Sequence, residues 1–436
     1  MSFSPDWLRR RLIDLGADKA TRLVVALSGG LDSTVLLHTL SRLASGVPVS
    51  AIHVNHQLHA DADRWQQHCE ELCASLAIPL QAVTVAVATD SGAGPEAAAR
   101  TARYAAFREQ LRAGDVLLSA HHLDDQAETL LLHLMRSSGP LGLAGMPTER
   151  ALGKARLLRP LLDVRRETLR QYADREELSW VEDPGNADTG LDRNYLRHDI
   201  LPRLESRWPR SSQRLARSSE LLSEASALLD ALAAIDLADK DPARLPVDRL
   251  LALGDVRARN LLRYTARQLD LPVPPATALQ RIVNECLTAK EDAQPLVEWH
   301  GANARRYRNE LFLLADPSAP PDGGQLKPGD SLDLGVLGRL HADADSPRGV
   351  SPKIAVDGFR VAFRDGGEAL QPERDAHRRP LKKLLQEAGV LPWMRARIPL
   401  LYCGETLVAV GDLWLEQSVV TAPGIAIRWE DRPVIR

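Results

Sequence analysis

The sequence predicts an α/β fold, in which a doubly wound parallel sheet is followed by a small helical domain and a C-terminal α+β domain. Three patterns lead to this prediction. Strand-like and helical patterns alternate over residues 1–140, mainly helical patterns follow, and short strand patterns separated by turn residues fill the end of the chain. The early strands are almost continuously apolar, which is typical of a parallel sheet covered on both faces. A chain of 436 residues has room for about two to four domains.

In the first part of the chain, each strand pattern is followed by a helical pattern. The expected strands are Arg22–Leu27, Val49–Val54, Ala82–Val87 and Asp115–Ala120. The expected helices are Asp32–Ala44, Asp61–Ala77, Pro95–Leu111 and Asp124–Met135. Ligands of such sheets bind at the carboxyl ends of the strands, so functional residues are expected directly after each strand.

Three domains are expected along the chain. Residues 150–217 are rich in arginine and helical in pattern, and a long helix is expected from about Arg214 to Leu237. Residues 240–315 are expected to form a helical module that ends in the strand-like sequence LFLLA, and Ala315–Gln325 has the Pro/Gly/Asp composition of a linker. A basic helix is expected at Arg378–Gly389. The predicted domains are residues 1–217, 218–315 and 328–436.

Composition narrows the class of protein. The chain is 44% hydrophobic and 26% charged, as in ordinary globular proteins, and no apolar run approaches the roughly 18–20 residues of a membrane span. The N-terminal sequence MSFSPDWLRRRLIDLG lacks the apolar stretch of a signal peptide, so we expect a cytoplasmic protein. The formal net charge of −3 means that any contact with nucleic acid must use local basic patches. The cysteines form no C-x-x-C pair and are expected to be buried or spectator thiols.

The strongest motif is SGGLDS, which directly follows the first strand and opens a helix. Its two glycines let the backbone approach an anion closely, and the N–H groups of a helix start favour negative charge. Asp32 could hold a Mg²⁺ ion that bridges phosphates. The alternative, a Gly-Gly turn with Ser33 or Asp32 as the helix cap, is disfavoured by the strand–loop–helix setting. The loop is therefore expected to bind a nucleotide through Ser28, Gly29, Gly30, Leu31, Asp32 and Ser33.

Polar residues also follow the second strand, in the sequence HVNHQLH at 53–59. Zinc is conceivable there, but no thiol pair has finger spacing, so hydrogen bonding to a nucleotide or to the sheet's own loop is favoured. On the helix expected at Pro95–Leu111, Arg100 and Arg103 share a face that would suit polyphosphate, unless that face is simply solvated.

The sequence HHLDDQAET follows the fourth strand. On a helix, Asp125 and Glu128 lie opposite the apolar stripe and therefore face the strand ends. The acids could cap the helix or complement its dipole, but capping accounts for only one of them. Carboxylates in this position could instead hold Mg²⁺ or orient an incoming amine.

Together these motifs resemble the tRNA(Ile)-lysidine synthetase family of PP-loop, Rossmann-like ATP pyrophosphatases. The resemblance covers the first 210 residues strongly and returns at Arg378–Leu415. Two residues depart from the family pattern, because His59 and Gly185 stand where Arg and Ser are usual. The motifs that carry it are SGGLDS, HVNHQL, EAAARTARY, HHLDDQAET, RSSGPLGLAGM, RPLL, EDPGNAD…LDRNYLRHDILP and, near the C-terminus, RRPLKKLLQEAGVLPWMRARIPLLYCGETLVAVGDLWL.

The resemblance implies a reaction in two steps. ATP, with Mg²⁺, would adenylate the C2 oxygen of the wobble cytidine in a tRNA(Ile) that carries a CAU anticodon. The ε-amine of free L-lysine would then displace AMP to give lysidine. A homodimer is the family precedent, and no membrane association is expected.

The resemblance also implies roles for individual residues. Asp32 would hold the metal, and the implied catalytic residues are Asp32, Arg103, Asp125 and Glu128. His53 and Asn55 would join the phosphate loop in binding the nucleotide. The implied substrate-binding residues are His122, Asp124, Asp125, Arg193, Asn194 and Arg197.

A C-terminal basic run offers a patch for tRNA phosphates. Residues 373–397 contain seven Arg and Lys against three acids, and such patches neutralise phosphates, although a solvated helix face is the plainer alternative. The residues expected to contact tRNA are Arg378, Arg379, Lys382 and Lys383.

Two other functions fit less well. Another PP-loop enzyme, such as a tRNA thiolase or an amidating synthetase, is disfavoured because thiolation needs cysteines in a spacing that is absent here. A catalytically silent tRNA-binding protein is disfavoured by the intact SGGLDS and HHLDDQ motifs.

Overall fold

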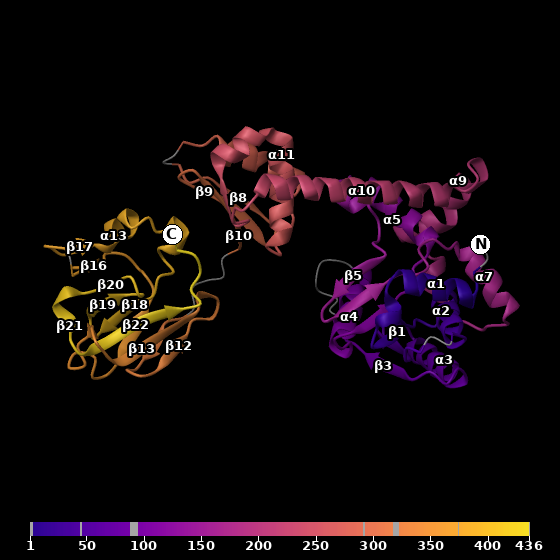
Figure 1. The fold of residues 1–436 in the computed structure, drawn as a ribbon, viewed down its shortest axis with the longest axis horizontal. Helices are drawn as coiled ribbons and strands as arrows, with labels where there is room; N and C mark the ends of the chain where they lie inside the picture. The colour runs from indigo at the N-terminus through magenta and orange to yellow at the C-terminus, as the bar shows by residue number, and fades with distance from the viewer. Residues whose placement is uncertain are drawn as a thin grey trace. The chain divides into compact units, whose positions relative to one another are not determined.

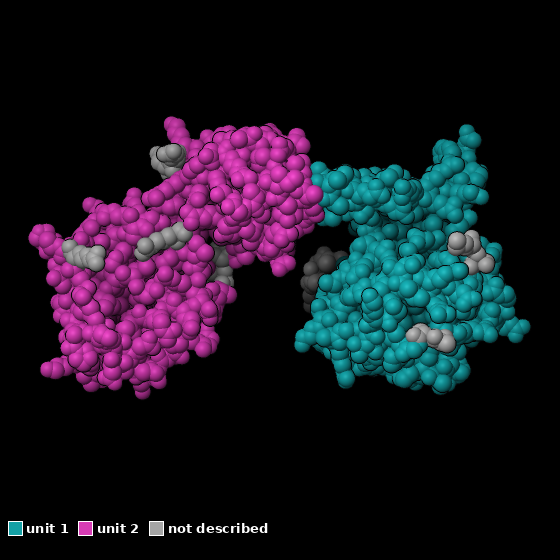
Figure 2. Space-filling view, viewed as in Figure 1, with its two compact units in different colours: residues 1–229 teal, residues 230–436 magenta. Residues whose placement is uncertain are grey.

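The computed structural model describes residues 3–43, 46–87, 95–290, 293–316, 322–373 and 375–435. The chain forms two compact units, Met1–Leu229 and Asp230–Arg436 (Figures 1 and 2). The finer division into three domains stays a prediction.

A six-stranded sheet forms the centre of the first unit, in the order β3-β2-β1-β4-β6-β5. All neighbouring strands are parallel except β5, which pairs antiparallel with β6. The chain moves outward from β1 in one direction and from β4 in the other, so the strand order reverses between these two. The strands are β1 (Arg22–Ala26), β2 (Val49–Asn55), β3 (Leu80–Thr84), β4 (Asp115–Leu118), β5 (Glu149–Leu152) and β6 (Ala155–Leu158).

Helices cover both faces of this sheet, which confirms the predicted doubly wound α/β fold. Alternate residues of β1 face opposite layers: Leu23 and Val25 join a core with the N-terminal helices, and Val24 joins a second core with Phe107. The helices are α1 (Pro5–Asp14), α2 (Leu31–Ser41), α3 (Ala62–Ser75), α4 (Pro95–Gln110), α5 (Leu123–Met135) and α7 (Arg166–Arg175) (Figure 1).

Two details of the predicted sheet are wrong. The third strand begins two residues before the expected Ala82 and ends at Thr84. The β5–β6 hairpin lies largely within residues 150–217, which were expected to be helical. Its short strands carry Arg150 and Arg156, so they lack the apolar run that marks a buried strand.

The remainder of the first unit is helical, as expected. Its last element is a long helix that begins at Ser211, three residues before the expected Arg214, and continues past the end of the unit at Leu229 to Leu237. The segments are α6 (Pro140–Leu143), α8 (Asp192–Tyr195), a π-helical turn (Leu196–Ile200), α9 (Leu201–Arg207) and α10 (Ser211–Leu237).

Residues 240–315 contain more strand than the predicted helical module. Four strands form an antiparallel sheet in the order β7-β10-β9-β8 beside two helices. The strand β9 could not be recognised in the sequence because it contains charged residues. One of them, Arg306, is buried, and its guanidinium donates to the carbonyl oxygens of Cys286, Leu287 and Ala289. The elements are β7 (Arg244–Pro246), α11 (Val247–Gln268), α12 (Ala276–Arg281), a π-helical turn (Ile282–Leu287), β8 (Leu296–Trp299), β9 (Ala302–Tyr307) and β10 (Glu310–Ala315).

The C-terminal part is α+β, as predicted, with two five-stranded sheets and one short helix, α13 (Leu381–Glu387). The expected helix Arg378–Gly389 is shorter because Arg379–Pro380 forms a strand. Part of the expected linker, residues 317–321, lies outside the described residues. The strands are β11 (Gly324–Leu326), β12 (Ser331–Asp333), β13 (Arg339–Ser346), β14 (Gly349–Val350), β15 (Phe359–Ala362), β16 (Ala369–Leu370), β17 (Arg379–Pro380), β18 (Leu400–Cys403), β19 (Thr406–Val410), β20 (Trp414–Leu415), β21 (Val420–Thr421) and β22 (Gly424–Glu430).

The cysteines are free thiols, as expected. Burial raises the pKa of Cys69 to about 12, of Cys73 to about 11 and of Cys286 to about 12, so these thiols are inert at neutral pH. Among the described residues, no helix is both long and apolar enough to cross a membrane.

Candidate active site

The loop Ser28–Ser33 connects β1 to α2 and is held together by its own hydroxyl groups. Ser33 Oγ accepts a hydrogen bond from the Ser28 N–H at 3.2 Å and donates to the Gly30 carbonyl at 3.1 Å. Gly29 has a φ of +82°, which favours glycine. Gly30 is the N-cap of α2 and makes no side-chain cap, so neither Ser33 nor Asp32 caps this helix. The start of α2 is therefore available to an anion.

Asp32 is the residue of this loop best placed to bind a cation. Its Oδ1 atom is buried and has no hydrogen-bond partner among the described residues. Its Oδ2 atom lies 3.6 Å from His122 Nε2 and 3.8 Å from Arg166 Nε. A buried carboxylate oxygen without a donor is unfavourable, and a bound cation would remove that cost. Asp32 therefore fits a Mg²⁺ ligand, because Mg²⁺ prefers carboxylate oxygen.

The polar residues at the end of β2 form hydrogen bonds within the protein itself. The ring Nδ1 of buried His53 lies 2.9 Å from the Leu27 carbonyl oxygen. Asn55 donates to Asp63 Oδ1 at 3.0 Å and accepts from the Gln57 N–H at 3.0 Å. These contacts favour the alternative in which the motif forms hydrogen bonds to the sheet's own loop. Nucleotide binding by His53 and Asn55 stays a prediction.

The other two histidines of this motif have separate partners. Arg103 Nε donates to His56 Nε2 at 3.1 Å. Burial, helped by Arg103, lowers the pKa of His56 to about 4, so the ring is neutral and accepts this bond. His59, which departs from the family pattern, stacks on Trp65 with ring centroids 4.8 Å apart. The three histidines therefore point to different partners and do not converge on one metal position.

His122 is the N-cap of α5 and forms a capping box with Asp125. The His122 N–H donates to Asp125 Oδ2 at 2.9 Å, and His122 Nδ1 accepts from the Asp125 N–H at 3.4 Å. Burial opposes the charged imidazole, but Asp125, Asp32 and Asp124 outweigh it and raise the pKa of His122. Capping thus accounts for one oxygen of Asp125 and leaves Oδ1 for other groups.

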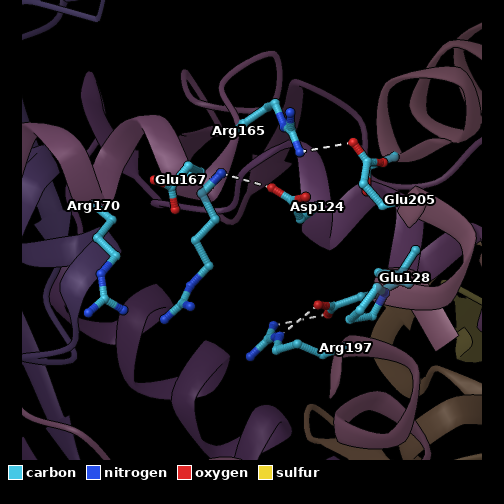
Figure 3. Close-up of a pocket in the computed structure, with 11 residues that line it drawn as sticks. Asp124, Glu128, Arg165, Glu167, Arg170, Arg197 and Glu205 are labelled. Atoms are coloured by element: carbon cyan, nitrogen blue, oxygen red, sulfur yellow. Dashed lines mark hydrogen bonds and ion pairs between the residues drawn. The ribbon is translucent and has the colours of Figure 1, made fainter. Parts of the chain in front are cut away.

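The second oxygen of Asp125 belongs to a buried cluster of four charges. Arg193 donates to Glu128 Oε2 at 2.8 Å and to Asp125 Oδ1 at 3.1 Å. Arg197 donates to Glu128 Oε1 at 2.7 Å and to Asp125 Oδ1 at 3.2 Å. The Glu128 side chain is 0% exposed, and its contact with Arg197 is drawn in Figure 3. The structure thus brings together four predicted site residues from two distant parts of the chain.

Asn194, also predicted to bind substrate, is buried and holds the adjoining loop. Its Nδ2 donates to the carbonyl oxygens of Gly185 at 2.8 Å and Asp188 at 2.9 Å. Gly185, the second departure from the family pattern, donates its N–H to Asp183 Oδ1 at 2.8 Å. The turn at Gly185 is therefore intact without a serine.

A cavity of about 270 Å³ opens beside the charged cluster (Figure 3). Asp124 lies on its wall and accepts a hydrogen bond from the Arg166 N–H at 2.8 Å. The cavity carries both signs of charge, as a site for a zwitterionic ligand must. The lining residues are Asp124, Glu128, Arg165, Arg166, Glu167, Arg170, Arg197, Leu201, Pro202, Glu205 and Ser212.

The arginines at the start of α7 on this wall, Arg165 and Arg166, were missed by the sequence reasoning. Arg165 and Arg166 follow the RPLL motif closely, and their position after the last parallel strand was the signal that could have found them.

The basic residues expected to contact tRNA lie in the second unit. Arg378 donates to the Ala369 carbonyl oxygen, and Arg379 pairs with Asp375 and Glu387. Lys382 and Lys383 are exposed on α13. Arg378 is exposed as well, and Arg379 is half-buried.

A parallel sheet with a glycine loop after β1 and paired acids after β4 defines the class of PP-loop proteins. The family model of the PP-loop domain matches residues 7–204. Models of the TilS substrate binding domain and the TilS substrate C-terminal domain match residues 245–312 and 359–429.

Relatives at full length identify the family. The chain is 43% identical to the tRNA(Ile)-lysidine synthase of Alkalilimnicola ehrlichii, with 98% of this chain and 97% of the relative covered. It is 39% identical to the tRNA(Ile)-lysidine synthase of Coxiella burnetii, with 94% and 92% covered. The chain belongs to the tRNA(Ile)-lysidine synthase family.

Proposed function

We propose that this protein is an ATP-dependent ligase that joins free L-lysine to C2 of the wobble cytidine in tRNA(Ile) with a CAU anticodon. ATP is converted to AMP and pyrophosphate, and the product is lysidine. The observation that carries the proposal is the placement of Asp32 within 3.6 Å of His122, which joins the phosphate loop to the acid cluster of α5. Family membership supports the same reaction.

The first step is adenylation of the cytidine. Cytosine O2 is a poor leaving group, and transfer of AMP to it creates a good one. The backbone of Ser28–Ser33 would bind the phosphates, and Arg103 would neutralise charge near the α-phosphate. Asp32 would hold Mg²⁺, which supplies positive charge to the phosphates when bound.

The second step is attack by the lysine amine. The 270 Å³ cavity lies beside Asp124 and Glu128 and carries both carboxylates and guanidinium groups, which matches an amino acid with two ammonium groups and one carboxylate. We infer that Asp124, Asp125 and Glu128 orient lysine. Because Arg193 and Arg197 already contact Asp125 and Glu128, these arginines would position the carboxylates as well as contact substrate.

Binding of tRNA would use the second unit as well as the first. Lys382 and Lys383, with Arg378 and Arg379, would contact phosphates of the tRNA. A cytoplasmic location follows from substrates of this kind, and a homodimer stays a prediction.

The test is incorporation of radiolabelled lysine into a tRNA(Ile) transcript, with and without ATP. We expect ATP-dependent labelling that disappears when the wobble C is changed to U. Absence of labelling while ATP is still cleaved to AMP would retain the PP-loop chemistry but refute lysine as the nucleophile.

A further inference from the structure

Three arginines gather around Tyr104 at the side of the sheet formed by β5 and β6. Arg150 of β5 places its Cζ atom 4.4 Å from the centre of the Tyr104 ring, and Arg100 of α4 places its own at 5.2 Å. Arg159, which directly follows β6, is only 2% exposed. None of the three makes an ion pair with a described carboxylate, so positive charge is concentrated here without protein counter-charge.

The hydrogen bonding of this Tyr104 cluster is incomplete. Arg159 donates to the Pro147 carbonyl oxygen at 2.6 Å, but its buried Nε has no partner, and the buried Nε of Arg150 also has none. Burial lowers the pKa of Arg159, and the neighbouring Arg150 and Arg100 add to the effect, although the Tyr104 hydroxyl opposes it. A buried guanidinium without an anion is costly, so the arrangement favours a bound anion with several acceptor oxygens.

The position of the Tyr104 cluster separates it from the phosphate loop. The strand order reverses between β1 and β4, and the loop Ser28–Ser33 begins where β1 ends. Arg103 reaches His56 beyond β2 on one side, whereas Tyr104 meets Arg150 of β5 and Arg159, which directly follows β6, on the other. Sheets of this kind bind ligands across the reversal, so an anion on the β6 side would lie across the reversal from the β2 side, where Arg103 meets His56.

His121 connects this position to the candidate active site. It directly precedes the N-cap His122, and its charge state responds to Asp125 on one side and to Arg159 and Arg100 on the other. Burial lowers the pKa of His121 to about 4, so at neutral pH it adds no charge between the two groups. The geometry agrees: the Ser119 N–H donates to the carbonyl oxygen of Leu158, which precedes Arg159, and Ser119 Oγ lies 2.6 Å from His121 Nδ1. An anion held by the Tyr104 cluster would therefore lie close to the reacting groups.

We propose that Arg100, Arg150 and Arg159 form a phosphate-binding site that holds a backbone phosphodiester of the RNA strand beside the cytidine to be modified. The site would fix the register of that nucleotide, because phosphate contacts position an RNA without reading its sequence. This inference rests on the RNA substrate of the proposed function, and nucleotide phosphate from ATP is the other source of the same chemistry.

The experiment measures binding of a fluorescein-labelled anticodon stem-loop RNA to the full chain by anisotropy, without ATP or lysine. In Arg150→Gln and Arg100→Gln we expect the dissociation constant to rise about tenfold and the slope of log affinity against log salt to fall by about 1. The KM for ATP in pyrophosphate release should stay within about twofold of the wild-type value, since a phosphate contact of the RNA does not touch ATP. Arg112→Gln, at the amino end of β4, is the matched control and should change neither quantity.

A second measurement changes the RNA instead of the protein, so its result on the wild type does not depend on whether a variant folds. Methylphosphonate at the linkage on one side of the cytidine should weaken binding to the wild type, and Arg150→Gln should lose no further affinity with that RNA. A raised KM for ATP with unchanged RNA affinity would assign the site to nucleotide phosphate and overturn the proposal. Unchanged RNA affinity in both variants, or wild-type binding that is insensitive to methylphosphonate on either side of the cytidine, would also overturn it. Because RNA binding is measured without catalysis, failure of lysine transfer would leave this result interpretable.

Discussion

His122 Nε2 lies 3.6 Å from Asp32 Oδ2 and 3.5 Å from Asp125 Oδ2, so one imidazole stands between the starts of α2 and α5. This meeting follows from the sheet, because β1 and β4 are adjacent and parallel and their carboxyl ends lie side by side. A residue that leaves β1 and a residue that leaves β4 must therefore meet at the same edge. The carboxylate of Asp32, which would bind the metal, is therefore fixed next to His122, the N-cap of the helix that carries the acids.

The first prediction separates catalysis from RNA binding. Asp32→Ala removes the carboxylate whose Oδ1 is buried without a partner. Pyrophosphate release should fall by about 100-fold or more, the scale of losing a metal-held charge in a phosphoryl site. Affinity for the anticodon stem-loop RNA should stay within about threefold, because neutralising an acid removes no phosphate contact. A collapse of RNA affinity would show that the two functions share this part of the molecule.

The second prediction concerns pH and follows from the raised pKa of His122. A group whose pKa is raised on folding stabilises the fold at low pH, and this stabilisation is lost as pH rises through the folded pKa. The difference in unfolding free energy between wild type and His122→Asn should therefore be largest below about pH 6.5 and shrink at higher pH. Urea unfolding at a series of pH values measures it, and a difference that grows with pH would contradict the assignment.

The third prediction concerns His121, whose effect on the pH dependence of stability is opposite to that of His122. Because burial lowers the pKa of His121 to about 4, the unfolded chain binds a proton at a higher pH than the folded chain does. His121 should destabilise the fold as pH falls from about 6.5 toward 4. His121→Asn should lessen this acid-induced loss of stability in the same unfolding series. If the variant lost stability between pH 6.5 and 4 as steeply as the wild type, the neutral state of His121 in the fold would be refuted.

The fourth prediction tests the buried charge cluster. Glu128→Gln leaves Arg193 and Arg197 with an uncompensated positive charge, and breaking a buried pair in this way costs about 3–5 kcal/mol. Glu149→Gln is the matched control, because its pair with Arg156 is close to half-exposed on both sides and is worth about 0–1 kcal/mol. Chemical denaturation of both variants measures the contrast. Equal losses would mean that the cluster gives no special stability to α5.

The sequence predicts the sheet and the loop but not the pairing of charges. Short apolar strands before SGGLDS and HHLDDQ are local patterns, and the rule that functional residues follow parallel strands places them correctly. The contact of Arg193 with Glu128 joins positions 65 residues apart, and no periodicity reports which arginine meets which acid. Likewise Arg150 lies in a strand and Arg159 is buried, although the arginine-rich residues 150–217 are helical in pattern. Hydropathy patterns cannot show that a charged residue is buried by distant parts of the chain, and such residues account for most of what was missed.

The last prediction concerns the shape of the phosphate loop. Gly29 has a φ of +82°, and a Cβ atom there would lie 3.0 Å from Cys69 Sγ. Gly16 has a φ of +63°, and nothing lies within 4 Å of its Cβ position. Gly29→Ala and Gly16→Ala should both lose about 1–2 kcal/mol of stability from the left-handed backbone. Only Gly29→Ala should also raise the KM for ATP, since the added methyl group must displace the loop from Cys69 or from the phosphates. Pyrophosphate-release kinetics on both variants distinguish the effect of backbone strain from the loss of the anion site. An unchanged KM for ATP in Gly29→Ala would contradict the assignment of this loop to nucleotide binding.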